Sequence, residues 1–184
     1  MFGESWQPVL VACRLGEEWA WRRVYEELAP AVLRYYRASR APEPEDLVGE
    51  TFVRVVQGLG AFDGDEGRFR AWVFTIARNR MIDAARSATR RPVQPVAPED
   101  LLGRGPVGNA EDDSLRSLSE QHVREMLDRL TADQRDVLLL RLLADLTIEQ
   151  IGEVLGKQPG AVKGLQARGL EEIRRQMTRG AVTF

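Results

Sequence analysis

The chain has 184 residues, 43% of them apolar, and its 26 basic and 28 acidic side chains give a formal net charge of −2. This length fits one domain or two small ones, and the near-neutral charge argues against a general nucleic-acid coat protein, which would be strongly basic. Cys13 is the only cysteine, which excludes an intramolecular disulfide and a CxxC metal site.

Residues 21–39 are predicted to be helical. Four apolar residues recur at the spacing of one helix face: Trp21, Val24, Tyr25 and Leu28. Pro30 is expected to interrupt this pattern, either as a break or in the first turn of a second helix over residues 31–39.

The next two predicted helices are separated by a turn. Pro44, followed by two acidic residues, suits the first turn of a helix that ends near residues 58–60. Residues 63–67 are rich in glycine and aspartate and predict a turn. A long helix is expected from about Phe69 to Ser87.

Residues 92–112 are predicted to form a flexible acidic linker, because they contain four prolines and three glycines. The linker would separate an N-terminal domain, residues 1–91, from a C-terminal domain, residues 113–184. Residues 68–91 hold seven arginines against one acid, whereas residues 93–114 hold five acids against one arginine. A basic segment followed by an acidic one indicates two different partners.

The C-terminal half predicts a helix-turn-helix. Capping boxes begin helices at Thr131 and Thr147, and Gly156 ends the second of these helices. A final helix would run from Pro159 to about Met177, with an inner face of Val162, Leu165, Gly169, Leu170 and Ile173. In such motifs the outer face near the helix start enters the DNA major groove; here it holds Pro159, Gly160, Ala161, Lys163, Gly164, Ala167 and Arg168. The alternative is an ordinary helical hairpin with a solvated basic face.

Several segments, in order along the chain, resemble the extracytoplasmic-function (ECF) sigma factors of the sigma-70 family. Residues 45–52, EDLVGETF, are similar to the helix that binds the polymerase clamp, and residues 69–83, FRAWVFTIARNRMID, to the helix that recognises and melts the −10 element. Residues 135–141 and 151–156 are similar to the C-terminal domain of the family. The resemblance implies an all-α fold of two small helical domains, sigma regions 2 and 4.

The resemblance also implies roles for particular side chains. The −10 element would be contacted by Phe62, Asp63, Arg78, Asn79, Arg80, Asp83, Arg86 and Arg90. The outer face of the last helix would contact the −35 element. The polymerase clamp would be bound by Asp46, Glu50, Thr51 and Arg54, for which a merely solvated charged face is the alternative. Phe62 is expected either to stack on an extruded base or to fill the core, and Trp72 is expected in the core.

The predicted function is therefore promoter-specific initiation with core RNA polymerase, bound through its clamp and flap. Candidate partners are core polymerase, promoter DNA and an anti-sigma factor, and no cofactor or metal is expected. A stand-alone helix-turn-helix regulator is the main alternative, and a protein-interaction module is another. An enzyme built on Cys13 and the only histidine, His122, is not supported by any further motif. No apolar run reaches the roughly 18 residues of a membrane span, and the N-terminus lacks signal-peptide features, so a cytoplasmic location is expected.

Overall fold

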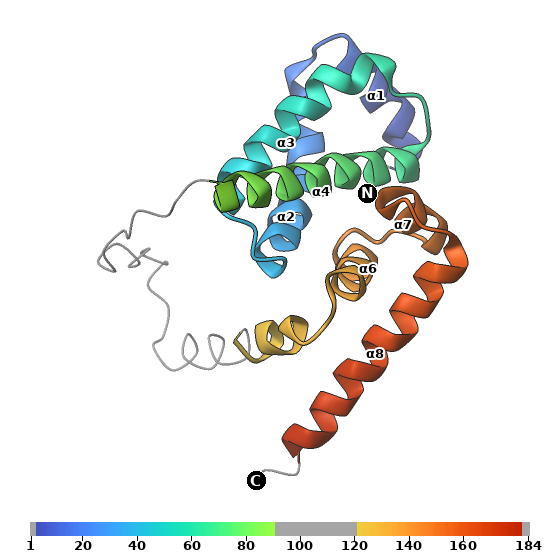
Figure 1. The fold of residues 1–184 in the computed structure, drawn as a ribbon. Coiled ribbons are helices and arrows are strands. Elements are labelled where there is room, and N and C mark those ends of the chain that lie inside the picture. Colours follow the sequence, from blue (N-terminus) through green and yellow to red (C-terminus); the bar gives the residue numbers. More distant parts are fainter. Residues whose placement is uncertain (1–2, 91–120, 182–184) are drawn as a thin grey trace, which may run out of the picture.

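The computed structural model describes residues 3–90 and 121–181, and every regular element in these two ranges is helical (Figure 1). The N-terminal range holds a short 3-10 helix, Gly3–Ser5, then α1 (Trp6–Arg14), α2 (Glu18–Ala38), α3 (Pro44–Gly58), a second 3-10 helix (Leu59–Ala61) and α4 (Glu66–Arg90). The C-terminal range begins with helical residues 121–128 and continues with α6 (Ala132–Leu143), α7 (Ile148–Leu155) and α8 (Pro159–Ala181).

The interruption predicted at Pro30 is wrong, because α2 is one continuous helix with Pro30 inside it. Proline removes one backbone hydrogen bond and crowds the preceding turn. Burial on both sides of it offsets that loss: Val24 and Leu28 before the proline, and Val32 and Tyr35 after it, are almost fully buried. Tertiary packing of one apolar face thus holds the helix together through a residue that breaks isolated helices.

α4 begins earlier and ends later than the sequence predicts. Asp65 Oδ1 accepts a hydrogen bond from the backbone N–H of Arg68 at 2.8 Å, which is the geometry that caps a helix start. The predicted glycine- and aspartate-rich turn is therefore shorter, since the helix already contains Glu66 and Gly67.

The helix-turn-helix forms as predicted. Thr131 and Thr147 each make a full capping box, with Gln134 and Gln150 as the reciprocal partners. Gly156 adopts a left-handed conformation with φ of 63°, which ends α7 and lets the chain turn into α8. One prediction for α8 is wrong: Leu170 is 46% exposed and does not belong to the inner face.

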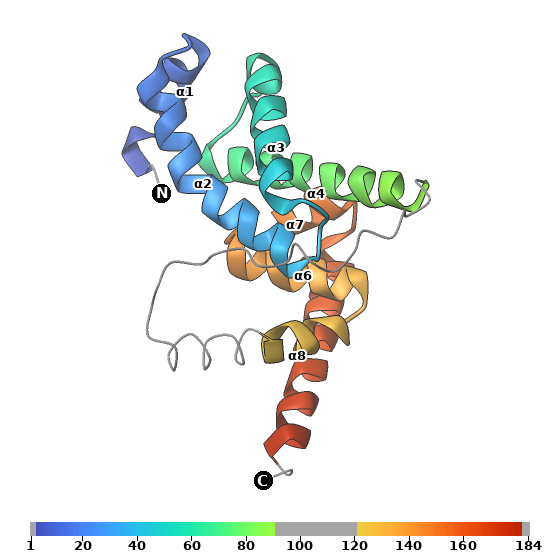
Figure 2. The ribbon, with the colours of Figure 1, turned by 90° about the vertical axis from the view of Figure 1, so that its left-hand side faces the viewer.

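The two halves of the chain pack against each other. α6 lies against α2 and α7 lies against α4, whereas α8 projects away from the N-terminal half (Figures 1 and 2). Buried residues of both halves form one continuous apolar cluster, which includes Phe74 of α4 and Ile151 of α7. We call this packing the closed arrangement. The predicted linker, residues 92–112, lies outside the described residues.

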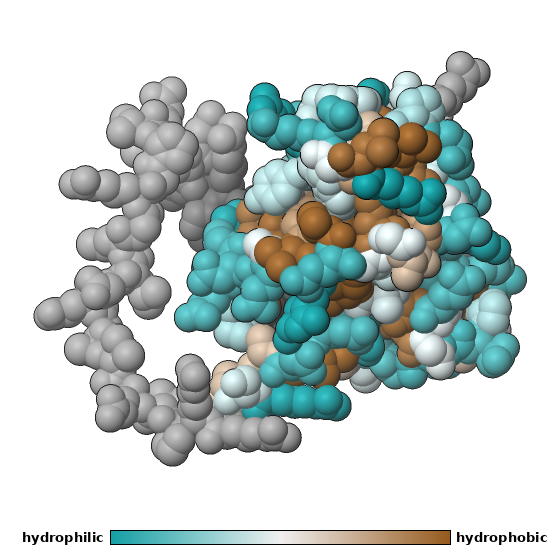
Figure 3. Space-filling model, turned by 90° about the horizontal axis from the view of Figure 1, so that it is seen from above, coloured by the Kyte–Doolittle hydropathy of each residue, from teal (hydrophilic) through white to brown (hydrophobic). Residues whose placement is uncertain are grey.

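The surface near α1 and α3 carries apolar side chains among hydrophilic ones (Figure 3). Val11, Leu15, Val53 and Val56 are each more than half exposed. None of the helices in the two described ranges has the length and apolarity needed to cross a membrane.

Candidate functional site

One face of α4 presents polar side chains to solvent. Asn79, Asp83 and Arg86 are exposed, and Thr75, at the same helical spacing, is half-buried with its hydroxyl donating to the Ala71 carbonyl at 2.9 Å. The amide of Asn79 can both donate and accept hydrogen bonds on a base edge. Arg90 ends α4, and its side chain lies outside the described residues.

Three arginines of the basic segment contact the protein itself. Arg70 is 8% exposed and donates at 3.5 Å to both the Ala144 carbonyl and Glu27. Arg78 pairs with Asp136 of α6, and Arg80 pairs with acids of α3 and α4. The excess of arginine in this segment therefore does not form one continuous basic surface in the closed arrangement.

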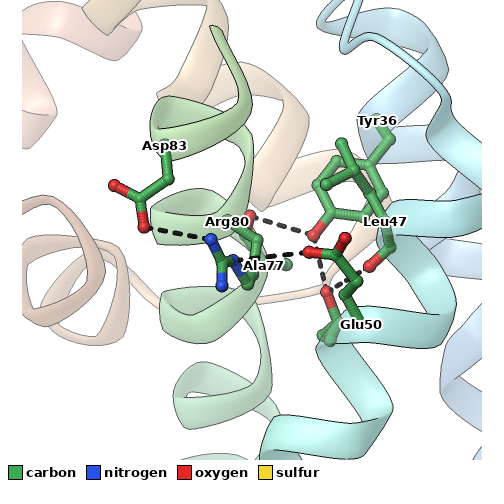
Figure 4. Close-up of polar contacts among 7 residues, drawn as sticks. Tyr36, Leu47, Glu50, Ala77, Arg80 and Asp83 are labelled. Carbon is green, nitrogen blue, oxygen red and sulfur yellow. Dashed lines mark hydrogen bonds and ion pairs between the residues drawn. The ribbon is translucent and has the colours of Figure 1, made fainter. Parts of the chain in front are cut away.

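Arg80 connects α4 to α3 (Figure 4). Its guanidinium lies 3.8 Å from Glu50 and 3.2 Å from Asp83. Directly beneath, the Tyr36 hydroxyl of α2 donates to the Ala77 carbonyl at 3.0 Å and lies 2.6 Å from the Thr51 hydroxyl. Burial raises the pKa of Tyr36 to about 12, so this phenol keeps its proton and its hydrogen bonds at physiological pH.

The predicted polymerase-binding residues divide into exposed and buried ones. Asp46, Glu50 and Arg54 lie exposed on α3. Thr51 is fully buried, and its hydroxyl donates to the Leu47 carbonyl at 2.7 Å. Thr51 therefore supports the charged face of α3 from beneath and does not present its side chain on it.

The ring of Phe62 packs against other aromatic rings. The ring is 9% exposed and lies 5.2 Å from the ring of Trp72 and 5.3 Å from that of Phe69, measured between centroids. Phe62 thus fills the core in the closed arrangement. Trp72 is partly buried against the same core, as expected. The next residue, Asp63, is exposed in the loop between α3 and α4.

The outer face of α8 is largely exposed, as predicted. Side chains or backbone are open to solvent at Pro159, Gly160, Ala161, Lys163, Ala167 and Arg168. Gly164 is half-buried, because the guanidinium of Arg168 lies over it. The turn before α8 is tied to α6 by an ion pair of 2.9 Å between Lys157 and Asp133.

A buried polar cluster joins the two halves of the chain. The carboxylate of Asp136, 7% exposed, accepts from Arg78 Nε at 2.8 Å and from the Tyr35 hydroxyl at 3.2 Å. Burial, and then the charge of Asp136, raises the pKa of Tyr35 well above its ordinary value, so the phenol stays a donor. An exposed ion pair between Arg40 and Asp128 also crosses between the halves.

Sequence reasoning missed this cluster. The one available signal is that Asp136 stands four residues before the fully buried Leu140, which places an acid on the apolar face of its helix. A buried charge needs a partner, but the sequence does not say which of the many arginines supplies it.

The geometry gives no support to a catalytic pair. Cys13 is buried in α1, and burial raises its pKa to about 11, which keeps the thiol protonated and poorly nucleophilic. His122 lies exposed on helical residues 121–128. In the parts of the chain that the structure describes, no three metal-ligating side chains gather at one place.

Two family descriptions match the chain: Sigma-70 region 2 over residues 23–91 and Sigma-70, region 4 over residues 120–173. The ECF RNA polymerase sigma factor ShbA of Streptomyces griseus is 34% identical over 169 residues, which cover 86% of this chain and 88% of that protein. The chain belongs to the ECF sigma factors. As a sigma factor, it directs promoter-specific transcription initiation and is a regulatory protein.

Two further proteins are similar to this sigma factor. The ECF RNA polymerase sigma factor BldN of Streptomyces coelicolor is 34% identical over 163 residues, or 87% of this chain, and the chain spans 61% of the length of that protein. The solved structure of the sigma factor RpoE with the anti-sigma factor NepR, from Bartonella quintana, matches with a TM-score of 0.62 at 19% identity. That match covers 85% of this sigma factor and 96% of RpoE, and shows the shared fold.

Proposed function

We propose that this sigma factor contacts its promoter at two points, each with a different half of the chain. In the N-terminal domain, residues 1–91, the exposed face of α3 would bind the polymerase clamp, and α4 with the loop before it would contact the −10 element. In the C-terminal domain, residues 113–184, α8 would contact the −35 element. The same domain would bind the polymerase flap. The observation that carries the proposal is one chain with an exposed Asn79 on α4 and an exposed outer face at the start of α8.

The closed arrangement is too small to make both contacts. A compact chain of this length has a radius of gyration of about 16 Å and is therefore about 40 Å across. The −10 and −35 elements lie about 25 base pairs apart, or about 85 Å along B-form DNA. The 30 residues from 91 to 120 can span at most about 100 Å. On this proposal the two halves separate for promoter recognition, and the 30 residues that connect them are long enough for that separation.

On the −35 side, few long side chains are available. Of the seven outer-face residues of α8, only Lys163 and Arg168 have long polar side chains. Direct base recognition in the major groove uses such side chains, whereas small residues let the helix backbone approach the groove floor. We therefore propose that Lys163 and Arg168 anchor the helix and that DNA shape supplies much of the −35 specificity.

The proposal predicts dependence on core polymerase. The isolated chain has net charge −2, and three arginines of its basic segment are paired with acidic side chains of the protein. Few cationic side chains are therefore available to neutralise DNA phosphates, and non-specific DNA binding should be weak. Run-off transcription with core enzyme on a genomic promoter library identifies the promoter. The free chain should then bind that duplex with a Kd above about 1 µM at physiological salt. Submicromolar binding without polymerase would instead support a stand-alone helix-turn-helix regulator.

Asn79→Ala should weaken −10 discrimination by about 1–3 kcal/mol, because a base edge would lose an amide that both donates and accepts. Relative transcription from promoters with single −10 substitutions measures the effect, and binding to core polymerase should not change. Gln121→Ala, which removes another exposed amide, is the control. Equal discrimination in Asn79→Ala and the control would contradict the role of Asn79.

An anti-sigma factor is the further candidate partner. RpoE of Bartonella quintana, which shares the fold, was solved with one. Together with core polymerase, such a partner would place the chain in the cytoplasm.

A further inference from the structure

The N-terminal helix α1 contacts the loop between α3 and α4. The ring of Trp6 is 5% exposed and packs on Phe69, with ring centroids 4.8 Å apart. Its indole N–H donates to the Gly64 carbonyl at 3.4 Å. At the other end of α1, Arg14 Nη2 donates to the Phe62 carbonyl at 2.5 Å. Two side chains of one helix therefore bind two carbonyls of the same loop.

These hydrogen bonds fall where the loop has no regular structure of its own. Residues 62–64 lie between the second 3-10 helix and Asp65, whose carbonyl accepts the first hydrogen bond of α4 from the Phe69 N–H at 2.9 Å. The carbonyls of Phe62 and Gly64 are therefore bound by α1 side chains just before the helix begins. Just after them, the backbone N–H of Gly3 donates to Glu66 at 3.0 Å. The N-terminal segment thus contacts residues 62, 64 and 66, and a carbonyl held by a fixed donor restricts the backbone torsions around it.

The consequence concerns Asp63. Asp63 is exposed and stands in the chain between the two residues whose carbonyls are bound, whereas the neighbouring Phe62 ring is packed into the core. The direction of the Asp63 side chain is therefore set by the backbone at Phe62 and Gly64. Preorganised groups recognise a ligand better than mobile ones, because less conformational freedom is lost on binding.

We propose that Trp6 and Arg14 are positioning residues for −10 recognition, which fix the loop that presents Asp63 to promoter DNA. This inference rests on the proposed function, in which the loop contacts the −10 element. It goes beyond it, because α1 precedes the region 2 match, which begins at residue 23. Specificity at the −10 element would then depend on a helix outside the matched region.

The test uses Arg14→Gln in the full chain. Arg14 is exposed on the helix surface, so the protein should still fold, but the shorter amide loses the charged donor to Phe62. With core polymerase, preference for the native −10 element over single-base variants should fall about tenfold at the one or two positions that the loop contacts. Discrimination at the positions contacted by Asn79 should not change. Arg14→Lys, which keeps a cationic donor, should restore most of the preference.

A second readout does not involve DNA. In hydrogen exchange of the free chain, backbone amides of residues 62–68 should exchange at least about fivefold faster in Arg14→Gln, with little change in α6. Trp6→Phe, which keeps an aromatic ring but removes the N–H, should also speed the exchange of these amides. Arg22→Gln is the matched control, because it removes an exposed arginine whose ion pair is with Glu18 on its own helix.

The outcomes separate the two proposals. Unchanged loop exchange and unchanged −10 preference in Arg14→Gln, while Asp63→Ala does lose preference, would overturn the role of α1 alone. An equal loss at every promoter position would also overturn it, because that result indicates general destabilisation. If Asp63→Ala itself leaves every −10 position unaffected, the proposed contact of the loop with the −10 element fails, and the inference fails with it.

Discussion

Asp136→Ala is expected to open the closed arrangement in solution. The substitution leaves Arg78 and the Tyr35 hydroxyl without the carboxylate that both contact, at 2.8 and 3.2 Å. Removing one member of a buried ion pair costs about 3–5 kcal/mol, and the partial exposure of Arg78 reduces this to about 2–3 kcal/mol. Small-angle X-ray scattering should show a larger radius of gyration for the variant than for the native chain.

A second ion pair provides the control for this experiment. Arg40 and Asp128 also connect the two halves, but their side chains are 63% and 36% exposed. An exposed pair contributes less than about 1 kcal/mol, so Arg40→Gln should leave the scattering unchanged. If Asp136→Ala and Arg40→Gln scatter alike, the buried cluster does not hold the halves together. Opening would also release Arg78 for the −10 contact that the family resemblance implies for it.

Gly152→Ala is expected to destabilise the helix-turn-helix by about 2 kcal/mol. A Cβ at this position would lie 2.7 Å from the backbone oxygen of Lys157, and backbone cannot move aside as a flexible side chain can. The same turn is closed by the Lys157 N–H, which donates to the Gly152 carbonyl at 2.8 Å. Shifting α7 away from the turn would therefore stretch this hydrogen bond. Urea unfolding measures the loss of stability, and transcription from −35-dependent promoters should fall as stability falls.

Gly160→Ala is the matched variant in the same motif. A Cβ there meets nothing within 4 Å, and alanine is favoured over glycine in a helix by up to about 1 kcal/mol. The free energy of unfolding should stay equal or rise. A Gly152→Ala protein as stable as Gly160→Ala would show that the turn accommodates a methyl group without cost.

The positions of most helices and the helix-turn-helix followed from the sequence, because each depends on neighbours within one or two turns. The capping box at Thr147 needs only Gln150, and the end of α7 needs only a residue that tolerates positive φ at Gly156. Where local rules failed, long-range packing was the cause. Pro30 stays inside α2 because the helix on both sides of it is buried against other helices.

The sequence predicted the candidate-site residues that remain exposed. It did not predict which of them bind distant groups of the same chain. Asn79 and Lys163 are exposed as their helical phases indicate. Arg78 instead pairs with a residue 58 positions away, and Arg70 donates to a carbonyl 74 positions away. A count of charges along the chain assigns all these arginines to one basic surface, since it contains no information on which distant groups meet.

The sequence by itself thus determined the family, the helical class and the positions of the two helices for which we propose DNA contacts. These features depend on local periodicity, on capping residues and on motifs of a few residues. Only the tertiary structure decided that α6 and α7 pack on α2 and α4, that Asp136 binds Arg78 and Tyr35, and that α1 anchors the loop at Phe62 and Gly64. Each of these contacts joins residues far apart in the chain. Whether they form depends on how apolar surfaces are buried together, which no local pattern specifies.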